Sequence, residues 1–127
     1  MENIISKVLN YLSECEGYHQ LCKGLHWQAE RNAEHVIVDE LDETMLKYQD
    51  QIAEVTMGLT GKKFTVGQLK TLLPNATTTE ALLREILSDT IAFKKEIGDD
   101  IEVCALQNVL DDVLTDVSQL KYRAQLI

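Results

Sequence analysis

Apolar residues recur at helical spacing along most of the chain, and proline, the residue that interrupts helices most strongly, occurs once, at Pro74. Intervals of three, four or seven residues between apolar positions place them on one face of an α-helix. No stretch shows the alternation of apolar and polar residues that is typical of a half-buried strand. The pattern predicts an all-α protein, and 127 residues are enough for one domain over residues 1–127 with its own core.

Capping residues and glycines divide the predicted helical sequence into four long helices, with a short helix between the second and third. The first two are expected at roughly residues 3–27 and from Asn32, as N-cap, to about Gly58, with Gly61 in the following turn. The others are a short helix opened by the capping box Thr65–Gln68 and halted by Pro74, a helix from the capping box Thr77–Glu80 to Gly98, and a last helix capped by Asp99. This order of elements predicts a four-helix bundle.

The charge of the chain narrows the classes of partner. Acidic residues outnumber basic ones 21 to 12, which gives a formal net charge of −9. Nucleic acids and anionic membranes both favour a basic surface, so neither is an expected partner. No apolar run approaches the ~20 residues that span a bilayer, and the first residues do not resemble a signal peptide. An acidic surface suits metal cations, although it also serves solubility alone.

Three cysteines, an odd number without a C-x-x-C motif, occur at Cys15, Cys22 and Cys104. We expect them to be small buried side chains of a protein in the reducing cytoplasm.

The predicted second helix carries a histidine and three carboxylates on one face. At about 100° per residue, Asp39, Asp50 and Glu54 lie about 40°, 60° and 100° from His35. The predicted core stripe of this helix lies about 160° away and comprises Val38, Leu41, Met45, Tyr48, Ile52, Val55 and Leu59. The histidine and carboxylates are therefore expected to point away from their own bundle.

That outward face also contains apolar residues, which favours its burial against another chain. They are Val36, Leu46, Ala53 and Met57.

Distance along the helix also favours a second chain. Asp39 and Asp50 lie about 16 Å apart along the axis, too far to ligate one metal ion within a chain. An antiparallel copy, related by a two-fold axis near Met45, would bring His35 and Asp39 against Asp50 and Glu54 of its mate. Imidazole and carboxylate groups suit Fe(II), Mn(II) or Zn(II). Acid pairs at this spacing are also common on solvated helices, so a plain surface face is the alternative.

The sequence LHW, followed by H-x-x-x-D, ten residues and D-x-x-x-E, resembles the ferroxidase signature of the Dps mini-ferritins. The resemblance covers nearly the whole chain and implies a ferritin-like four-helix bundle with a short extra helix between helices 2 and 3. It also implies an iron site at a dimer interface, in which His26, His35 and Asp39 of one subunit face Asp50 and Glu54 of the other. Trp27 is then the aromatic residue that lines the site.

By the same resemblance, the protein oxidises Fe(II), with hydrogen peroxide as the oxidant, and stores Fe(III) in a hollow twelve-subunit shell that protects the cytoplasm from oxidative stress. Mn(II) or Zn(II) is compatible with the same ligands. The interval of nine residues from His26 to His35 is about three shorter than in the family, and the basic N-terminal extension of some members is missing. A helical oligomer of the same fold that lacks ferroxidase turnover is therefore the alternative, and a nucleoid-binding module is disfavoured by the charge.

A third histidine, His19, follows Glu16 at the spacing of the Glu-x-x-His motif of di-iron bundles. Such bundles require two of these motifs on different helices, and the sequence contains one. We therefore expect His19 to be a core or interface residue.

Overall fold

Four α-helices account for most of residues 4–127, the part of the chain that the computed structural model describes. Their bounds are α1 Ile4–Gln28, α2 Asn32–Thr60, α3 Thr79–Ile97 and α4 Cys104–Ala124, with a 3₁₀ turn η1 at Ile101–Val103 before α4. No strand occurs in this range, so the predicted all-helical class is confirmed. The expected start of the first helix at residue 3 lies outside the described residues.

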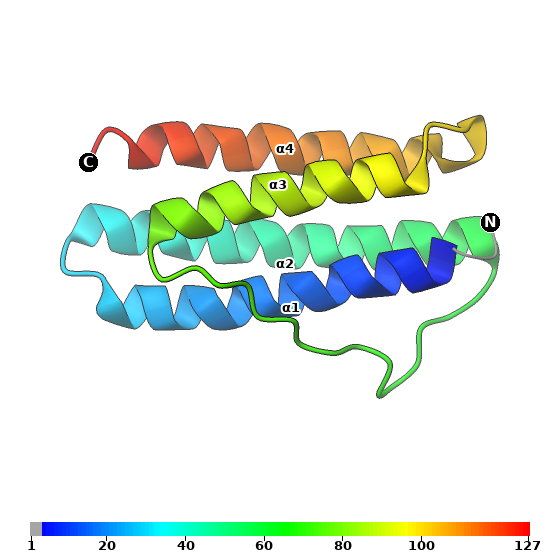
Figure 1. The fold of residues 1–127 in the computed structure, drawn as a ribbon, viewed down its shortest axis with the longest axis horizontal. Coiled ribbons are helices and arrows are strands. Elements are labelled where there is room, and N and C mark those ends of the chain that lie inside the picture. Colours follow the sequence, from blue (N-terminus) through cyan, green and yellow to red (C-terminus); the bar gives the residue numbers. More distant parts are fainter. Residues whose placement is uncertain (1–3) are drawn as a thin grey trace.

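The helices form a bundle in which α1 packs on α2 and α3, and α4 packs on the same two helices. Figure 1 shows that α1 and α2 run in opposite directions, whereas α2 and α3 run in the same direction. The connection between α2 and α3, residues 61–78, therefore runs back along the outside of the bundle next to α1. The tight turn between α1 and α2 fixes the two helices side by side at one end of the molecule.

Each helix contributes a stripe of buried apolar side chains to one core. On α2 the predicted stripe is confirmed for Val38, Leu41, Met45, Tyr48 and Ile52. Towards the end of α2 the prediction is not met, because Val55 is only partly buried and Leu59 is 37% exposed.

Three predicted caps are wrong by a few residues. Arg31, not Asn32, is the N-cap of α2, and its side chain makes no capping hydrogen bond. Thr78, not Thr77, caps α3 by accepting a hydrogen bond from the Ala81 amide at 3.1 Å. Asp99 does not begin α4, because the 3₁₀ turn η1 intervenes. The second helix continues to Thr60, two residues beyond its predicted end near Gly58, and Gly61 in the following turn has a left-handed backbone with φ of 69°.

The short helix predicted to begin at Thr65 does not form. One turn is present, in which Gln68 Oε1 accepts from the Thr65 amide at 2.6 Å and the Gln68 amide donates back to the Thr65 carbonyl at 3.2 Å. The next amides are held by α1, because Lys70 donates to Ser13 Oγ at 3.1 Å and Leu72 to the Ser13 carbonyl at 3.0 Å. These long-range bonds replace the i→i−4 bonds that a helix would need.

Two of the three cysteines lie in the core. Cys15 and Cys22 are buried as predicted, but Cys104 is exposed, because it begins α4 at the end of the bundle.

Among residues 4–127, none of the helices combines the length and the apolar character that crossing a bilayer requires.

Candidate metal centre

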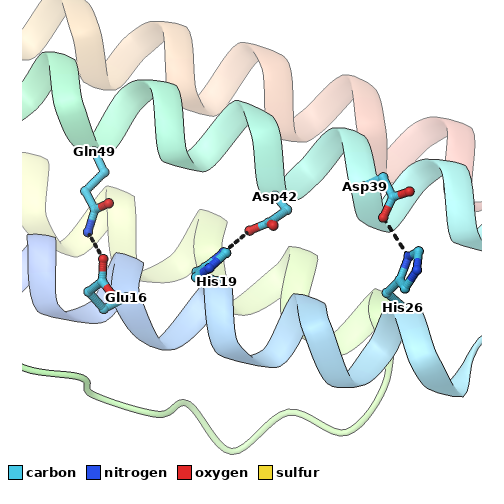
Figure 2. A network of polar contacts seen from close by, with 6 residues as sticks. All are labelled: Glu16, His19, His26, Asp39, Asp42 and Gln49. Carbon is cyan, nitrogen blue, oxygen red and sulfur yellow. Dashed lines mark hydrogen bonds and ion pairs between the residues drawn. The ribbon is translucent and has the colours of Figure 1, made fainter.

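Three of the predicted ligands meet at the end of the bundle where α1 joins α2. His26 lies in the last turn of α1, and His35 and Asp39 lie in the first two turns of α2. The turn between the helices is only three residues long, so the two segments are antiparallel neighbours, and Figure 2 shows His26 directed at Asp39. The short interval between His26 and His35 therefore still brings both imidazoles to one place.

The three side chains can offer ligand atoms that all lie within 4.8 Å of one another, and they form the metal-compatible cluster identified among residues 4–127. His26 Nδ1 lies 2.7 Å from Asp39 Oδ1. The rings of His26 and His35 approach edge to face, with their centroids 4.1 Å apart. The side chain of His26 is 37% exposed and that of Asp39 is 60% exposed, so an ion can reach the cluster from solvent.

His26 and Asp39 lie at ion-pair distance, but their contact does not have the geometry of a hydrogen bond. His26 Nδ1 is buried and has no hydrogen-bond partner, although the carboxylate oxygen is close, because the oxygen lies outside the direction in which the ring can donate. Two ligands at about 2.1 Å from one metal ion and at right angles to each other are about 3 Å apart. The spacing of these two atoms is therefore close to that of neighbouring ligands on one ion.

A cysteine next to the cluster is not a candidate ligand. Burial, together with the smaller effect of the nearby carboxylates of Asp42 and Asp39, raises the pKa of the Cys22 thiol to about 12. Its sulfur is also not among the ligand atoms that lie within 4.8 Å of one another, so Cys22 is not counted in the cluster.

The other two predicted ligands stand apart within the chain. Asp50 and Glu54 are exposed on the second half of α2 and do not join the cluster. Asp50 lies at the wall of a separate cavity of about 210 Å³ between α1, α2 and the connection. Trp27 is 78% exposed, so it does not line the cluster within one chain.

The predicted orientation of the ligand face needs a correction. His35 and Asp39 do not point away from their own bundle, because the end of α1 lies beside them and supplies His26. Helical angles within α2 do not reveal this neighbour, because the position of α1 depends on the turn that joins the two helices.

Two further polar contacts link α1 and α2 along the same seam, as Figure 2 shows. His19 Nδ1 donates to Asp42 Oδ1 at 2.7 Å, and Gln49 Nε2 donates to Glu16 Oε1 at 2.9 Å. His19 is thus half-buried where α1 packs on α2, and its expected place at an interface between chains stays a prediction. The roles of Asp42 and Gln49 were not predicted from the sequence. The one pattern that could have indicated them is their spacing of seven residues, which equals the spacing of His19 and His26 on α1.

Two imidazoles and one carboxylate on one side of an ion leave the other coordination positions open. This ligand set is characteristic of non-haem Fe(II) sites that react with an oxidant, and it also accepts Mn(II) and Zn(II). The open positions can take water, an oxidant or ligands from another chain.

The fold and the site together define an all-helical bundle with a candidate two-histidine, one-carboxylate metal centre. The chain belongs to a family of unknown function, DUF5856, whose sequence profile matches residues 26–124. The matched region begins at the first histidine of the cluster and includes every predicted ligand. No curated protein and no solved structure is significantly similar to the chain.

Proposed function

We propose that the protein binds Fe(II) at His26, His35 and Asp39 and oxidises it in the cytoplasm, as a member of the ferritin-like class. The convergence of these three side chains within 4.8 Å is the observation that carries the proposal. The sequence resemblance to the Dps mini-ferritins supports it independently, because it selects the same three residues as the ligands of one subunit.

The connectivity of the bundle supports the ferritin-like assignment. Ferritin-like folds are four-helix bundles with one long crossover connection. The connection at residues 61–78 is long, and it joins two helices that run in the same direction (Figure 1).

In the proposed site, a second subunit supplies Asp50 and Glu54, and iron is the substrate. Both residues are exposed on α2, and each lies on the half of the helix that a two-fold axis would bring to the other subunit's cluster. Additional carboxylates favour Fe(III) over Fe(II), because the harder and more highly charged ion gains more from anionic oxygen ligands. Oxidation is therefore promoted by the ligand set itself.

The electron balance of the proposed reaction is simple. Two Fe(II) ions each give one electron to hydrogen peroxide, whose O–O bond breaks, and two protons complete two water molecules. The Fe(III) product would be stored inside a hollow, twelve-subunit shell, for which the net charge of −9 provides acidic surface.

An anaerobic Fe(II) titration of the wild-type protein and two histidine variants tests the proposal. His35→Ala should weaken Fe(II) binding at least about tenfold, since a direct ligand is lost. His19→Ala is the matched control, because His19 lies on the same seam but outside the cluster. Addition of peroxide should then produce Fe(III) absorbance in the wild type and the control. Equal Fe(II) affinity in all three proteins would refute the metal site.

A second candidate is a helical oligomer whose site binds metal, such as Zn(II), without turnover. The close approach of His26 to Asp39 favours it, because this pair already joins α1 to α2 without any redox role. In the same titration, tight Fe(II) binding without oxidation by peroxide would select this candidate.

A further inference from the structure

An open cavity lies beside the second half of the proposed ligand face. It has a volume of about 210 Å³ and lies between α1, α2 and the connection. Gln49, Asp50 and Thr65 contribute polar groups to its wall, and the other lining residues are apolar. The apolar lining includes Leu9, Leu12, Ala53, Met57, Phe64 and Leu69. The connection contributes two of these residues because it is extended here and packs along α1 rather than folding into the expected helix.

The most exposed aromatic side chain of α1 lies beside the first half of that face. Trp27 is the only tryptophan of the chain, follows His26 directly, and is 78% exposed. It shares a face of α1 with Leu9, since the two are eighteen positions apart, which corresponds to about five full helical turns. One face of the molecule therefore presents a large apolar side chain at one end and an apolar cavity at the other.

The two-fold axis of the proposed metal site would bring these two features together. It places His35 and Asp39 of one subunit opposite the partner's Asp50 and Glu54. Because Trp27 adjoins His26 on the first side, and the cavity adjoins Asp50 on the second, the same rotation places the indole over the partner's cavity. A two-fold contact is self-complementary, so each interface makes this contact twice.

We propose that two copies of the chain associate by inserting Trp27 of each into the cavity of the other. This inference rests on the two-fold arrangement of the proposed function. The cavity has the size of one large side chain, and buried tryptophans are among the strongest anchors of protein interfaces. Gln49 offers an acceptor for the indole N–H, because its amide nitrogen already donates to Glu16 and Leu12, which leaves its carbonyl oxygen available.

Fluorescence of the single tryptophan tests the insertion directly. In the dissociated chain Trp27 should emit as a water-exposed indole, and association should shift its emission to shorter wavelength. Ala53→Phe fills the cavity and should abolish the shift. If this variant does not fold, Leu69→Lys, on the connection outside the helices, replaces it. Associated wild-type protein that retains exposed-indole emission would overturn the inference, even where Fe(II) oxidation requires both chains.

Self-association constants provide a second readout. Trp27→Ala and Ala53→Phe should each weaken association at least ~30-fold, the loss expected for an interface hot spot. The double variant should be no weaker than either single one, since both changes remove one contact. Ile101→Ala, an equally exposed apolar position at the other end of the bundle, is the control and should associate normally.

These measurements separate this inference from the proposed function. A blue shift that Ala53→Phe abolishes supports the insertion even if no Fe(II) is oxidised. Additive losses in the double variant, or a chain that stays monomeric at all concentrations, would contradict it.

Discussion

At the scale of single residues, the carboxyl group with the largest rise in pKa among residues 4–127 lies away from the metal cluster. Glu14 lies half-buried between α1 and α3, close to three other acids, Glu85, Asp89 and Glu96. Burial, together with the hydrogen bond to Asp89 and the charge of Asp89, raises the pKa of Glu14 to about 8. Asp89 also accepts a hydrogen bond from the Tyr18 hydroxyl at 2.5 Å. Burial and the neighbouring acids therefore favour the protonated form of Glu14 at neutral pH.

Glu14 makes the free energy of unfolding depend on pH. Its pKa rises from the usual value of 4.5 to about 8 in the fold, so between these values only the unfolded chain releases the proton. The contribution of Glu14 to stability is therefore greatest below about pH 4.5 and is lost as pH rises through about 8. Glu14→Gln should remove most of this loss, because the amide keeps a donor and cannot ionise. Urea unfolding at about pH 5 and about pH 9 measures the change.

The control for this prediction is Glu30→Gln, since Glu30 is exposed in the turn between α1 and α2. It should leave the pH dependence of unfolding as in the wild type. A Glu14→Gln variant with the wild-type dependence would show that the proton is held elsewhere.

Three of the five ligands predicted from the sequence lie together in the structure, whereas contacts between helices were not predicted. Helical spacing placed His35 and Asp39 on one face, and the family resemblance added His26; the structure brings these three together. The pairing of His19 with Asp42 was not predicted, because a contact across two helices depends on their relative register. The sequence of a single helix does not specify its register relative to a neighbouring helix.

At the scale of elements, the connection of residues 61–78 is held against α1 by a close backbone approach. At Gly17 a Cβ atom would lie 1.9 Å from the carbonyl oxygen of Leu72. Such a distance is a hard clash with backbone, which cannot rotate away as a side chain can. Glycine at this position therefore allows the connection to reach Ser13 and donate its amides there.

Gly17→Ala should therefore displace the connection and lower the free energy of unfolding by about 1–3 kcal/mol, the usual cost of overpacking. Gly24→Ala is the matched control on the same helix, because a Cβ there would meet nothing within 4 Å. It should stabilise by up to about 1 kcal/mol through helix propensity. Denaturant unfolding measures both changes, and limited proteolysis should cut residues 61–78 faster in Gly17→Ala. Equal stabilisation by both substitutions would contradict the close approach.

The helices themselves were predictable from sequence, and the connection was not. Periodicity gave four long helices, because their apolar stripes are local in sequence. The capping signal at Thr65–Gln68 did form its first turn, as the bond from Thr65 to Gln68 shows. The helix stopped there because Ser13, more than fifty residues earlier, binds the next amides. A local signal was overridden by a long-range contact that sequence spacing does not encode.

At the scale of the whole molecule, the proposed iron site is divided between two chains. The cluster at His26, His35 and Asp39 is present in one chain, whereas Asp50 and Glu54 lie on the other half of α2. A two-fold axis creates two such sites in each dimer, and each site uses one half from each chain. Variants that lack opposite halves can therefore complement one another.

Co-assembly of two inactive variants tests this division. One variant lacks His35 and Asp39, the other lacks Asp50 and Glu54, and each alone should oxidise Fe(II) slowly because every site has lost part of its ligands. A mixed dimer contains one site that retains only His26 and one intact site, so it should regain up to about half of the wild-type rate per dimer. A site within one chain predicts no recovery, because each chain remains defective after mixing. If mass spectrometry confirms mixed dimers and peroxide-dependent oxidation of Fe(II) still does not recover, the two-chain site is refuted.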